Sequence, residues 1–494
     1  MQKLKPIMFV GTASDVGKSM INTGFCRIFM QDGYQPAPFK AQNMSLNSYA
    51  TPQGYEIGRA QAVQAEACGI DCNTDMNPIL LKPTSDKSSQ VVLHGKPIGN
   101  QSAYDYFMGN NKQELFKEAK IAYDRLSEKY NPVVLEGAGS ISELNLKHRD
   151  ITNMRMALHA KADVYLIADI DRGGVFGSVY GTIALLTLEE KQLIKGIIIN
   201  KFRGDARLFE EGKKTIEDLC KIPVVGVVPF RKDIYIEEED SVGLQQKSNQ
   251  LESGKINVVV VLLNRMSNFT DFDRLENDER VHLFYSKDPS EIEKADIIII
   301  PGSKNTIADL IDIKNNGVAK AIVNAHKNNK IVIGICGGFQ MMGQSVEDPF
   351  HVEGTIESMS GLGLLPVKTV LTETKVTKQC KFKFKQAADW CEGYEIHMGL
   401  TTANELDQPL NKIDSIHSDG YSLTDSCWGT YIHGILDNEV VIDDLLNKFE
   451  LNIDTKPFDY KSFKNEQYDK LAQHLREHLD IAYIYTQLLS TSTH

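Results

Sequence analysis

The chain has 494 residues, of which 42% are hydrophobic and 24% are charged, and its formal net charge at pH 7 is −12. A chain of this length exceeds what one hydrophobic core normally supports, so we expect at least two domains. No apolar run approaches the ~20 residues that span a bilayer, and a nucleic-acid-binding surface needs a basic stripe, so we expect neither a membrane nor a nucleic acid as a partner.

The start of the chain and its cysteines indicate the compartment. The first six residues lead directly into an apolar run, which leaves no room for a removable signal sequence. The eight cysteines are scattered, and although Cys68 and Cys72 can share one helix face, no second Cys/His pair stands nearby to complete a zinc site. We therefore expect a cytoplasmic protein with reduced thiols.

Residues 1–235 are predicted to form a parallel sheet covered by helices on both faces. Short, continuous apolar runs alternate here with longer amphipathic segments, which is the pattern of strands buried on both faces. The runs occupy residues 7–10, 132–135, 164–168, 196–199 and 224–228. The first domain is therefore expected to belong to the α/β class.

A phosphate-binding loop is predicted directly after the first run. Such a loop turns backbone N–H groups toward an anion at the start of a helix, while a lysine reaches the outer phosphates and a hydroxyl binds Mg²⁺. Lys18 and Ser19 fit these two roles. The loop is a variant, because the usual pattern has glycine at the position of Thr12 and here the glycine stands one residue earlier. The residues predicted to bind the nucleotide in this loop are Gly11, Thr12, Asp15, Val16, Gly17, Lys18 and Ser19.

Residues at the ends of later strands are candidates to complete an ATP and Mg²⁺ site. Glu136 follows the run at 132–135, at the edge of the sheet where open α/β proteins bind ligands, and is the favoured second Mg²⁺ ligand beside Ser19. Asp169 and Asp171 follow the next run and compete for the same role. Asn200 and Lys201 are candidates to read the adenine edge, because an amide offers both a donor and an acceptor.

Basic and amide side chains cluster at residues 40–45 and 77–83, and Arg155 and Arg172 follow later. Such groups suit the carboxylates and amides of a substrate, although each one taken alone is equally compatible with a solvated surface position. The residues predicted to contact the substrate are Lys40, Gln42 and Asn43.

The remaining chain divides into a linker, a second domain and a tail. Residues 236–254 are acidic and polar, as expected of a solvated linker. Residues 255–449 are predicted to form a second α/β domain, while residues 450–494 are predicted to be helical, polar and peripheral. The strand-like runs of the second domain occupy residues 256–263, 296–300 and 331–335.

A reactive thiol is predicted at Cys336, in the sequence Gly-Ile-Cys-Gly-Gly at residues 334–338. Flanking glycines are typical of a sharp strand-to-helix turn that exposes a nucleophile, and the start of a helix favours the thiolate. The N–H of Gly337 is predicted to donate to the oxyanion formed when an amide carbonyl is attacked. Gly302 and Ser303, directly after another strand, are predicted to supply the second donor and glutamine contacts.

Two histidines compete to be the base for this thiol. His433 follows a β-prone segment and precedes a glycine, and is favoured as the base. His397 is expected to have a structural or glutamine-positioning role. A phosphate loop and a thiol together indicate an enzyme that couples ATP to the transfer of nitrogen from glutamine.

These segments strongly resemble the cobyric acid synthase family over nearly the whole chain. The most specific segments are residues 38–47, 76–83, 168–174, 301–306, 334–338 and 431–434. The resemblance implies an N-terminal synthetase domain similar to dethiobiotin synthetase and a C-terminal class I glutaminase domain. It further implies ATP and Mg²⁺ as cofactors, and glutamine and a corrinoid acid as substrates. The family reaction is amidation of adenosylcobyrinic acid a,c-diamide at its b, d, e and g carboxylates in cobalamin synthesis.

One position departs from the wider class I glutaminases, which carry a glutamate two residues after the histidine, where this chain has Ile435. Asp437 is a candidate to orient His433 instead, and the orienting group stays unassigned at this point. The enzymatic alternatives are cobyrinic acid a,c-diamide synthase and cell-wall amidotransferases, which differ in acceptor. A partitioning-type regulatory ATPase is the non-enzymatic alternative, but it has no use for Cys336.

Overall fold

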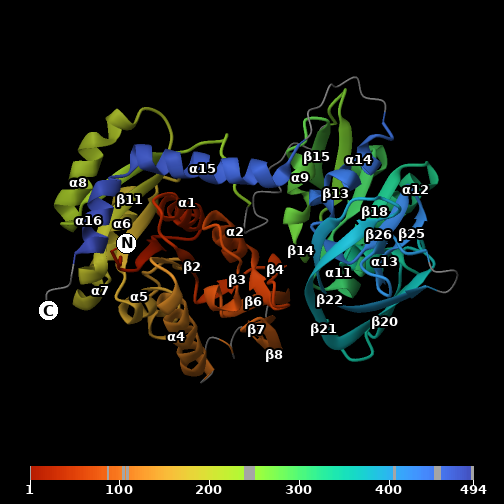
Figure 1. Ribbon diagram of the computed structural model, residues 1–494, viewed down its shortest axis with the longest axis horizontal. Helices are drawn as coiled ribbons and strands as arrows, with labels where there is room; N and C mark the ends of the chain where they lie inside the picture. Colours follow the sequence, from red (N-terminus) through yellow and green to blue (C-terminus); the bar gives the residue numbers. More distant parts are fainter. Residues whose placement is uncertain are drawn as a thin grey trace.

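The computed structural model describes residues 2–85, 88–102, 106, 111–237, 251–403, 408–449 and 458–490. Two α/β lobes lie side by side, and a long helix near the C-terminus passes from the second lobe back to the first (Figure 1). The predicted two-domain α/β class is confirmed. Most of the predicted linker, residues 238–250, and residues 450–457 and 491–494 of the predicted tail lie outside the described residues.

The first lobe is built on a sheet of six parallel strands. Each predicted run forms one of them, and residues 37–39 add an edge strand that the sequence analysis did not predict. In spatial order the strands are β12 (Val224–Pro229), β11 (Ile194–Phe202), β10 (Asp163–Asp169), β1 (Ile7–Gly11), β9 (Val133–Glu136) and β2 (Ala37–Phe39). Their carboxyl ends share one edge, which is where the phosphate loop begins.

Helices cover both faces of this sheet, because successive side chains of a strand point to opposite faces. Ile7 and Phe9 pack in one buried cluster, whereas Met8 and Val10 pack in another on the opposite face. The helices of this lobe that precede the linker are α1 (Lys18–Gln31), α2 (Arg59–Ala67), α4 (Asn111–Lys129), α5 (Met154–Ala160), α6 (Val175–Ala184), α7 (Leu188–Leu193) and α8 (Glu210–Cys220).

The C-terminal helices α15 (Tyr460–His478) and α16 (Ile481–Leu489) complete the first lobe. Leu471 and Leu475 are fully buried against the same cluster as α1, and Arg27 of α1 is paired with Asp469 at 2.7 Å. The prediction that this segment is peripheral is therefore wrong. It failed because α15 is mostly polar, and only a narrow stripe at helical spacing faces the core.

Small β elements lie between the lobes (Figure 1). A four-stranded sheet contains β3 (Gln42–Met44), β6 (Ile79–Ser85), β7 (Ser88–Leu93) and β8 (Lys96–Ser102). A hairpin of β4 (Ser48–Ala50) and β5 (Glu56–Gly58) contacts the second lobe. These elements connect the cavity of the first lobe to that of the second.

The second lobe has its own central sheet, in which the predicted runs again form neighbouring strands. The strands are β15 (Val281–Ser286), β13 (Ile256–Val261), β16 (Ile297–Ile300), β18 (Ile331–Ile335), β26 (Cys427–Thr430) and β25 (Tyr421–Thr424), and only β25 is antiparallel to its neighbour. The accompanying helices are α9 (Asp273–Glu276), α10 (Pro289–Lys294), α11 (Thr306–Asn315), α12 (Val318–Lys327), α13 (Gly337–Met342) and α14 (Glu439–Leu446).

A second, more twisted sheet extends this lobe toward the first. Its long strands are antiparallel, and the short strand carrying His433 pairs with them. Its strands are β19 (Ser345–Glu347), β20 (Ser358–Ser360), β21 (Val367–Phe384), β22 (Cys391–Ala403), β23 (Asn411–Lys412), β24 (Ser418–Asp419) and β27 (Ile432–His433). Two further short strands, β14 (Met266–Ser267) and β17 (Gly302–Ser303), pair beside the thiol.

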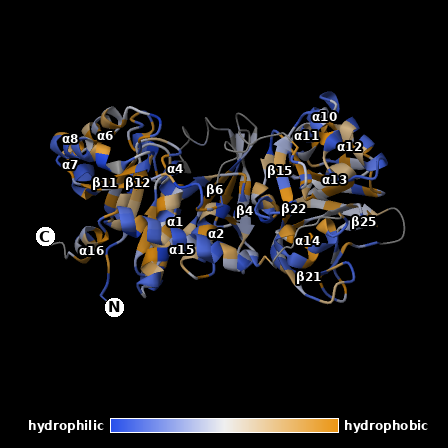
Figure 2. Ribbon diagram, turned by 90° about the horizontal axis from the view of Figure 1, so that it is seen from above, coloured by the Kyte–Doolittle hydropathy of each residue, from blue (hydrophilic) through white to orange (hydrophobic). Residues whose placement is uncertain are grey.

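Hydrophobic residues concentrate on the strands inside each lobe, while outward helices such as α8 and α10 are largely hydrophilic (Figure 2). In the described part of the chain, no helix combines the length and the hydropathy needed to cross a bilayer.

Candidate functional site

The phosphate loop joins the end of β1 to the start of α1. Gly17 has a left-handed backbone with φ of 94°, and a Cβ there would lie 2.2 Å from Asn200 Nδ2. At Gly11 a Cβ would lie 2.7 Å from the carbonyl of Ala13 and 3.0 Å from Lys18 Nζ. The variant glycine position is therefore explained by close approach, because the loop folds back directly over residue 11.

Lys18 lies across the mouth of this loop. Its Nζ donates to the carbonyl oxygens of Ala13 at 3.0 Å and Gly139 at 3.1 Å. These two backbone carbonyls hold the ammonium group at the loop, where the phosphates of a nucleotide would bind. The loop itself is anchored to the sheet by the N–H of Thr12, which donates to Ile167 O at 3.0 Å.

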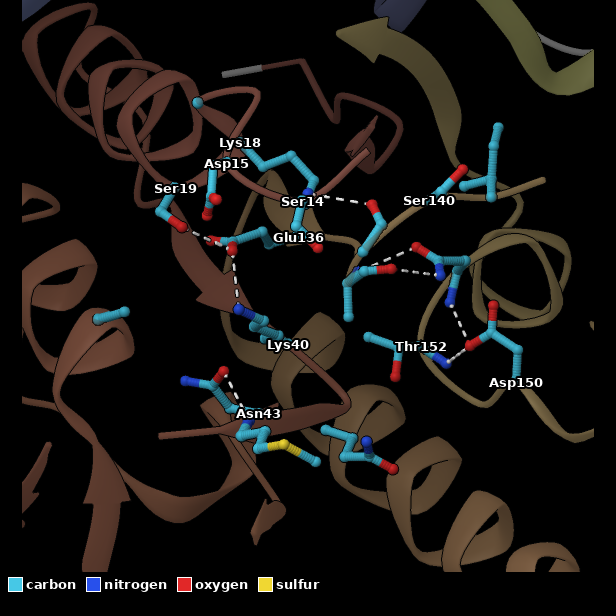
Figure 3. Close-up of a pocket in the computed structure, with 18 of the residues that line it drawn as sticks. Ser14, Asp15, Lys18, Ser19, Lys40, Asn43, Glu136, Ser140, Asp150 and Thr152 are labelled. Atoms are coloured by element: carbon cyan, nitrogen blue, oxygen red, sulfur yellow. Dashed lines mark hydrogen bonds and ion pairs between the residues drawn. The ribbon is translucent and has the colours of Figure 1, made fainter. Parts of the chain in front are cut away.

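Glu136 is the centre of a polar cluster beside the loop (Figure 3). Its carboxylate accepts hydrogen bonds from Ser19 Oγ at 2.8 Å, Lys40 Nζ at 2.9 Å and Gln64 Nε2 at 2.6 Å. Burial opposes ionisation, but Lys40 and these hydrogen bonds outweigh it and lower the pKa of Glu136. The structure thus brings the two predicted Mg²⁺ ligands together, and a hydroxyl next to an ionised carboxylate is an oxygen donor set that suits Mg²⁺.

The competing carboxylates are paired elsewhere. Asp169 Oδ2 lies 3.1 Å from Lys201 Nζ, and Asp171 is exposed and paired with Arg203 at 2.7 Å. Asn200 Nδ2 donates to Val16 O at 2.8 Å, and Lys201 Nζ donates to Asp15 O. Asn200 and Lys201 therefore hold the phosphate loop through its backbone carbonyls. Their contact with adenine stays a prediction.

A cavity of about 770 Å³ opens from the loop. Its lining contains more cationic than anionic side chains, which is the local basic pocket that an anionic substrate needs in an acidic protein. The cations are Lys18, Lys40, Lys112, Lys147, Arg149, Arg172 and Lys201. Gln42 and Asn43 also line it, and Gln42 Oε1 accepts from Tyr106 Oη at 2.6 Å and Lys112 Nζ at 2.9 Å. The predicted substrate residues and phosphate loop thus share one cavity.

Two of the basic residues in the predicted substrate cluster lie away from this cavity. The guanidinium of Arg155 stacks on Phe116 at 4.5 Å and donates to His148 O. Lys82 points instead toward the second lobe, where it lines the cavity around the thiol.

The thiol stands at a sharp turn between β18 and α13. Cys336 has φ of 53° and ψ of −108°, a strained backbone that turns its side chain out of the sheet edge. A Cβ on Gly338 would lie 1.9 Å from Ile300 O, and one on Gly337 would lie 2.7 Å from Ser303 N. The glycines are thus required by packing, and the predicted oxyanion donors Gly337 and Ser303 are neighbours.

His433 and Cys336 are brought together, although almost a hundred residues separate them. Both side chains line one cavity with Ser303, and the Cys336 thiol donates to Ile396 O at 3.6 Å. His433 Nδ1 lies 2.7 Å from Asp271 Oδ2, and the N–H of Gly434 donates to Asp271 Oδ1 at 2.9 Å. Burial opposes the imidazolium, but the Asp271 carboxylate outweighs it and, with Cys336, raises the pKa of His433 to about 10.

Asp271 was missed by the sequence analysis, which considered Asp437. It lies on a single turn, Phe269–Phe272, before α9 and 162 residues from His433, so no spacing rule connects the two. Asp437 is half-buried, and desolvation raises its pKa to about 7, but no hydrogen bond or ion pair links it to His433 within the described residues. Asn268, Thr270, Asp271 and Asp273 are all buried, but burial follows from the fold, so the sequence alone carried no signal that could have identified Asp271.

His397 has the supporting position expected of it. Its ring stacks on Tyr431 with centroids 3.8 Å apart, and its nitrogens lie 2.9 Å from Gly399 O and 3.1 Å from Glu395 Oε2. Both nitrogens are thereby engaged, and the ring forms one wall of the thiol cavity.

Comparisons with known proteins agree with both sites. The family description "CobQ/CobB/MinD/ParA nucleotide binding domain" matches residues 7–244, and "CobB/CobQ-like glutamine amidotransferase domain" matches residues 257–441. A protein of Parabacteroides distasonis named "Cobyric acid synthase" is 63% identical over 99% of both chains. The chain belongs to the cobyric acid synthase family.

Other members of the cobyric acid synthase family match over similar lengths. The protein with this name from Bacteroides fragilis is 62% identical over 98% of both chains. The one from Clostridium perfringens is 46% identical over 98% of this chain and 99% of its own. In this cobyric acid synthase family member, the phosphate loop falls within the matched nucleotide-binding domain and the thiol within the matched glutamine amidotransferase domain. The chain is therefore a glutamine amidotransferase of the ligase type.

Proposed function

We propose that this chain amidates adenosylcobyrinic acid a,c-diamide at its b, d, e and g carboxylates, using ATP and glutamine. The observation that supports this most is the presence of two complete sites in contacting lobes: a phosphate loop with a basic cavity, and a thiol with a histidine and an aspartate. The names of the full-length relatives supply the corrinoid acceptor.

In the second lobe, His433 holds the thiol proton as an imidazolium, in keeping with its raised pKa, and the sulfur of Cys336 attacks the side-chain amide carbon of glutamine as the thiolate. Asp271 fixes the ring through Nδ1 and stabilises the imidazolium that forms. The N–H groups of Gly337 and Ser303 stabilise the oxyanion, each contributing roughly 3 kcal/mol in the transition state. His433 then protonates the leaving ammonia, and water hydrolyses the thioester to glutamate and free thiol.

In the first lobe, a substrate carboxylate attacks the γ-phosphoryl group of ATP and forms an acyl phosphate. Lys18 stabilises the negative charge on the transferring group, and the loop N–H groups hold the phosphates. Ser19 and Glu136 are the residues that would hold Mg²⁺, which neutralises phosphate charge when bound. Ammonia displaces phosphate from the acyl phosphate and leaves the amide.

Ammonia must reach the first lobe without being protonated in bulk water, so the lobes need a sheltered contact. Tyr49 of the first lobe packs on Tyr394 with ring centroids 4.6 Å apart, and Tyr394 stacks on His433 at 5.3 Å. Gln379 Nε2 donates to Ala50 O at 2.9 Å in the same region. These contacts between the lobes, of which Tyr394 and His433 are buried, support a protected route between the sites.

The test is conversion of corrinoid acids by the purified chain with ATP and Mg²⁺, followed by mass spectrometry. Cys336→Ala should abolish glutamine-driven amidation and retain ammonia-driven amidation, whereas Lys18→Ala should abolish both. Amidation at the a and c positions would instead assign the chain to the cobyrinic acid a,c-diamide synthase reaction. If Cys336→Ala kept its glutamine-driven activity, the thiol assignment would be wrong.

A further inference from the structure

The cavity around Cys336 is lined by charged side chains that play no part in the proposed attack by the thiol. Lys82, Lys304 and Lys375 line it together with Glu353, and Glu56 contacts it from the first lobe through two of these lysines. Three ammonium groups therefore face two carboxylates in a confined space. An ammonium group without a counter-charge in such a space is costly unless an anionic group binds it.

The lysines differ in their partners. Lys82 Nζ lies 2.7 Å from Glu56 Oε1, and Lys375 Nζ is paired with the other oxygen of the same carboxylate. Lys304 Nζ has no hydrogen-bond or ion-pair partner among the described residues, although it is half-buried and lines the cavity beside Cys336. Burial and the neighbouring ammonium groups of Lys375 and Lys82 lower the pKa of Lys304 to about 7.

Glu353 is the complementary group on the same wall. Its Oε2 accepts from the N–H of Thr306 at 2.6 Å, and its Oε1 is 3.4 Å from Thr306 Oγ1. A carboxylate accepts about four hydrogen bonds, so capacity remains for a cationic donor. Lys304 and Glu353 are close enough to influence each other's ionisation, yet no direct ion pair joins them.

We propose that Lys304 binds the α-carboxylate of glutamine and Glu353 its α-ammonium, which places the side-chain amide at Cys336. The ammonium group of Lys304 and the Glu353 carboxylate, which can still accept further hydrogen bonds, match the α-carboxylate and α-ammonium groups of a free amino acid. A peptide-linked glutamine has neither charge, so the pair selects the free amino acid. This inference rests on the proposed function, because it assigns binding residues to the glutaminase step.

The cavity volume of about 50 Å³ holds a few water molecules rather than a glutamine. Its walls include the long side chains of Lys304, Lys375 and Met398, which can change rotamer without moving the backbone. Glutamine therefore enters by displacing these side chains. Of the lysines, Lys304 is the one whose ammonium group can move without breaking an ion pair among the described residues.

The test uses glutamine and two analogues, each lacking one charged group, as substrates of the full-length enzyme. 4-Aminobutanamide lacks the α-carboxylate and glutaramic acid lacks the α-amino group. Lys304→Met should raise KM for glutamine roughly 10- to 100-fold, the range for a lost hydrogen bond to a charged group, and leave kcat/KM for 4-aminobutanamide unchanged. Glu353→Gln should show the reverse selectivity: kcat/KM should fall for glutamine and stay unchanged for glutaramic acid.

Lys320→Met is the matched control, because it removes an exposed lysine of α12 in the same lobe and should change neither constant. Ammonia-driven amidation shows that each variant is folded. If Lys304→Met does not fold, Lys304→Arg and Lys304→Gln replace it. The KM for glutamine should then be lower for Lys304→Arg, which keeps the positive charge, than for Lys304→Gln. An unchanged KM for glutamine, or an equal loss on glutamine and 4-aminobutanamide, overturns the assignment. A wild-type enzyme that hydrolyses no glutamine refutes the proposed function instead.

Discussion

A buried histidine is normally neutral, since burial disfavours the imidazolium. His433 is buried, yet its pKa is raised, because the equally buried carboxylate of Asp271 lies against Nδ1. The same contact fixes the tautomer, leaving Nε2 for the thiol. At the scale of residues, we therefore expect the chemistry proposed for the second lobe to depend on this ion pair as much as on Cys336.

Replacing Asp271 with asparagine keeps the shape of this side chain but should impair the function of His433 as the base. An asparagine can donate to Nδ1 and stabilise the wrong tautomer, so we expect glutamine-driven activity to fall roughly 100-fold or more. Ammonia-driven amidation should be unaffected, because it bypasses the thiol. The measurement is the rate of glutamate release compared with the ammonia-driven rate.

Asp437→Asn is the control for Asp271→Asn, since Asp437 is a neighbouring, half-buried aspartate that makes no hydrogen bond or ion pair with His433 in the part of the chain that the structure describes. It should retain most glutaminase activity. A larger loss in this control than in Asp271→Asn would show that Asp437 orients the histidine.

At the scale of elements, sequence patterns predicted the central strands because a strand buried on both faces is almost continuously apolar. They also placed Gly17 and Gly338 correctly, since a Cβ would collide with the Asn200 side chain at Gly17 and with the carbonyl of Ile300 at Gly338. They did not find Asp271, whose position depends on how a short turn packs against a strand far along the chain. They misjudged α15 because its buried stripe is narrow and its partner helix, α1, lies at the opposite end of the sequence.

Helix α15 should therefore be required for the stability of the first lobe. Leu475 packs on the backbone of Gly24, where an added Cβ would lie 2.3 Å from Leu475 Cδ1. Leu475→Ala removes this contact and leaves a cavity, so the free energy of unfolding should fall by about 2–5 kcal/mol. Urea unfolding of the full chain measures this.

The exposed Leu188 of α7 provides the comparison, since 80% of its surface is accessible. Leu188→Ala should leave the unfolding midpoint almost unchanged. Equal midpoints for the Leu475 and Leu188 variants would mean that α15 contributes little to the lobe.

At the scale of the molecule, the two lobes are joined by a charged contact rather than by an apolar surface alone. Glu56 on β5 of the first lobe is buried and bonds Lys82 of its own lobe, while its second oxygen pairs with Lys375 on β21 of the second lobe. Lys82 follows directly on the part of β6 that pairs with β3, whose residues Gln42 and Asn43 line the first cavity. A short path of backbone therefore connects the cavity of the first lobe to the cavity around Cys336.

Glu56→Gln should loosen this connection. It leaves Lys82 and Lys375 buried without their shared counter-charge, and breaking a buried pair in this way costs about 3–5 kcal/mol. Glu392→Gln is the matched control, because its ion pair with Lys381 at 3.0 Å is exposed and worth about 1 kcal/mol or less. Calorimetry should show a much lower unfolding temperature for Glu56→Gln only. Where the corrinoid acceptor changes the rate of glutamate release by the wild-type enzyme, Glu56→Gln should abolish that change. If acceptor still altered glutamate release in a folded Glu56→Gln enzyme, the two sites must communicate through another contact, such as Tyr49 on Tyr394.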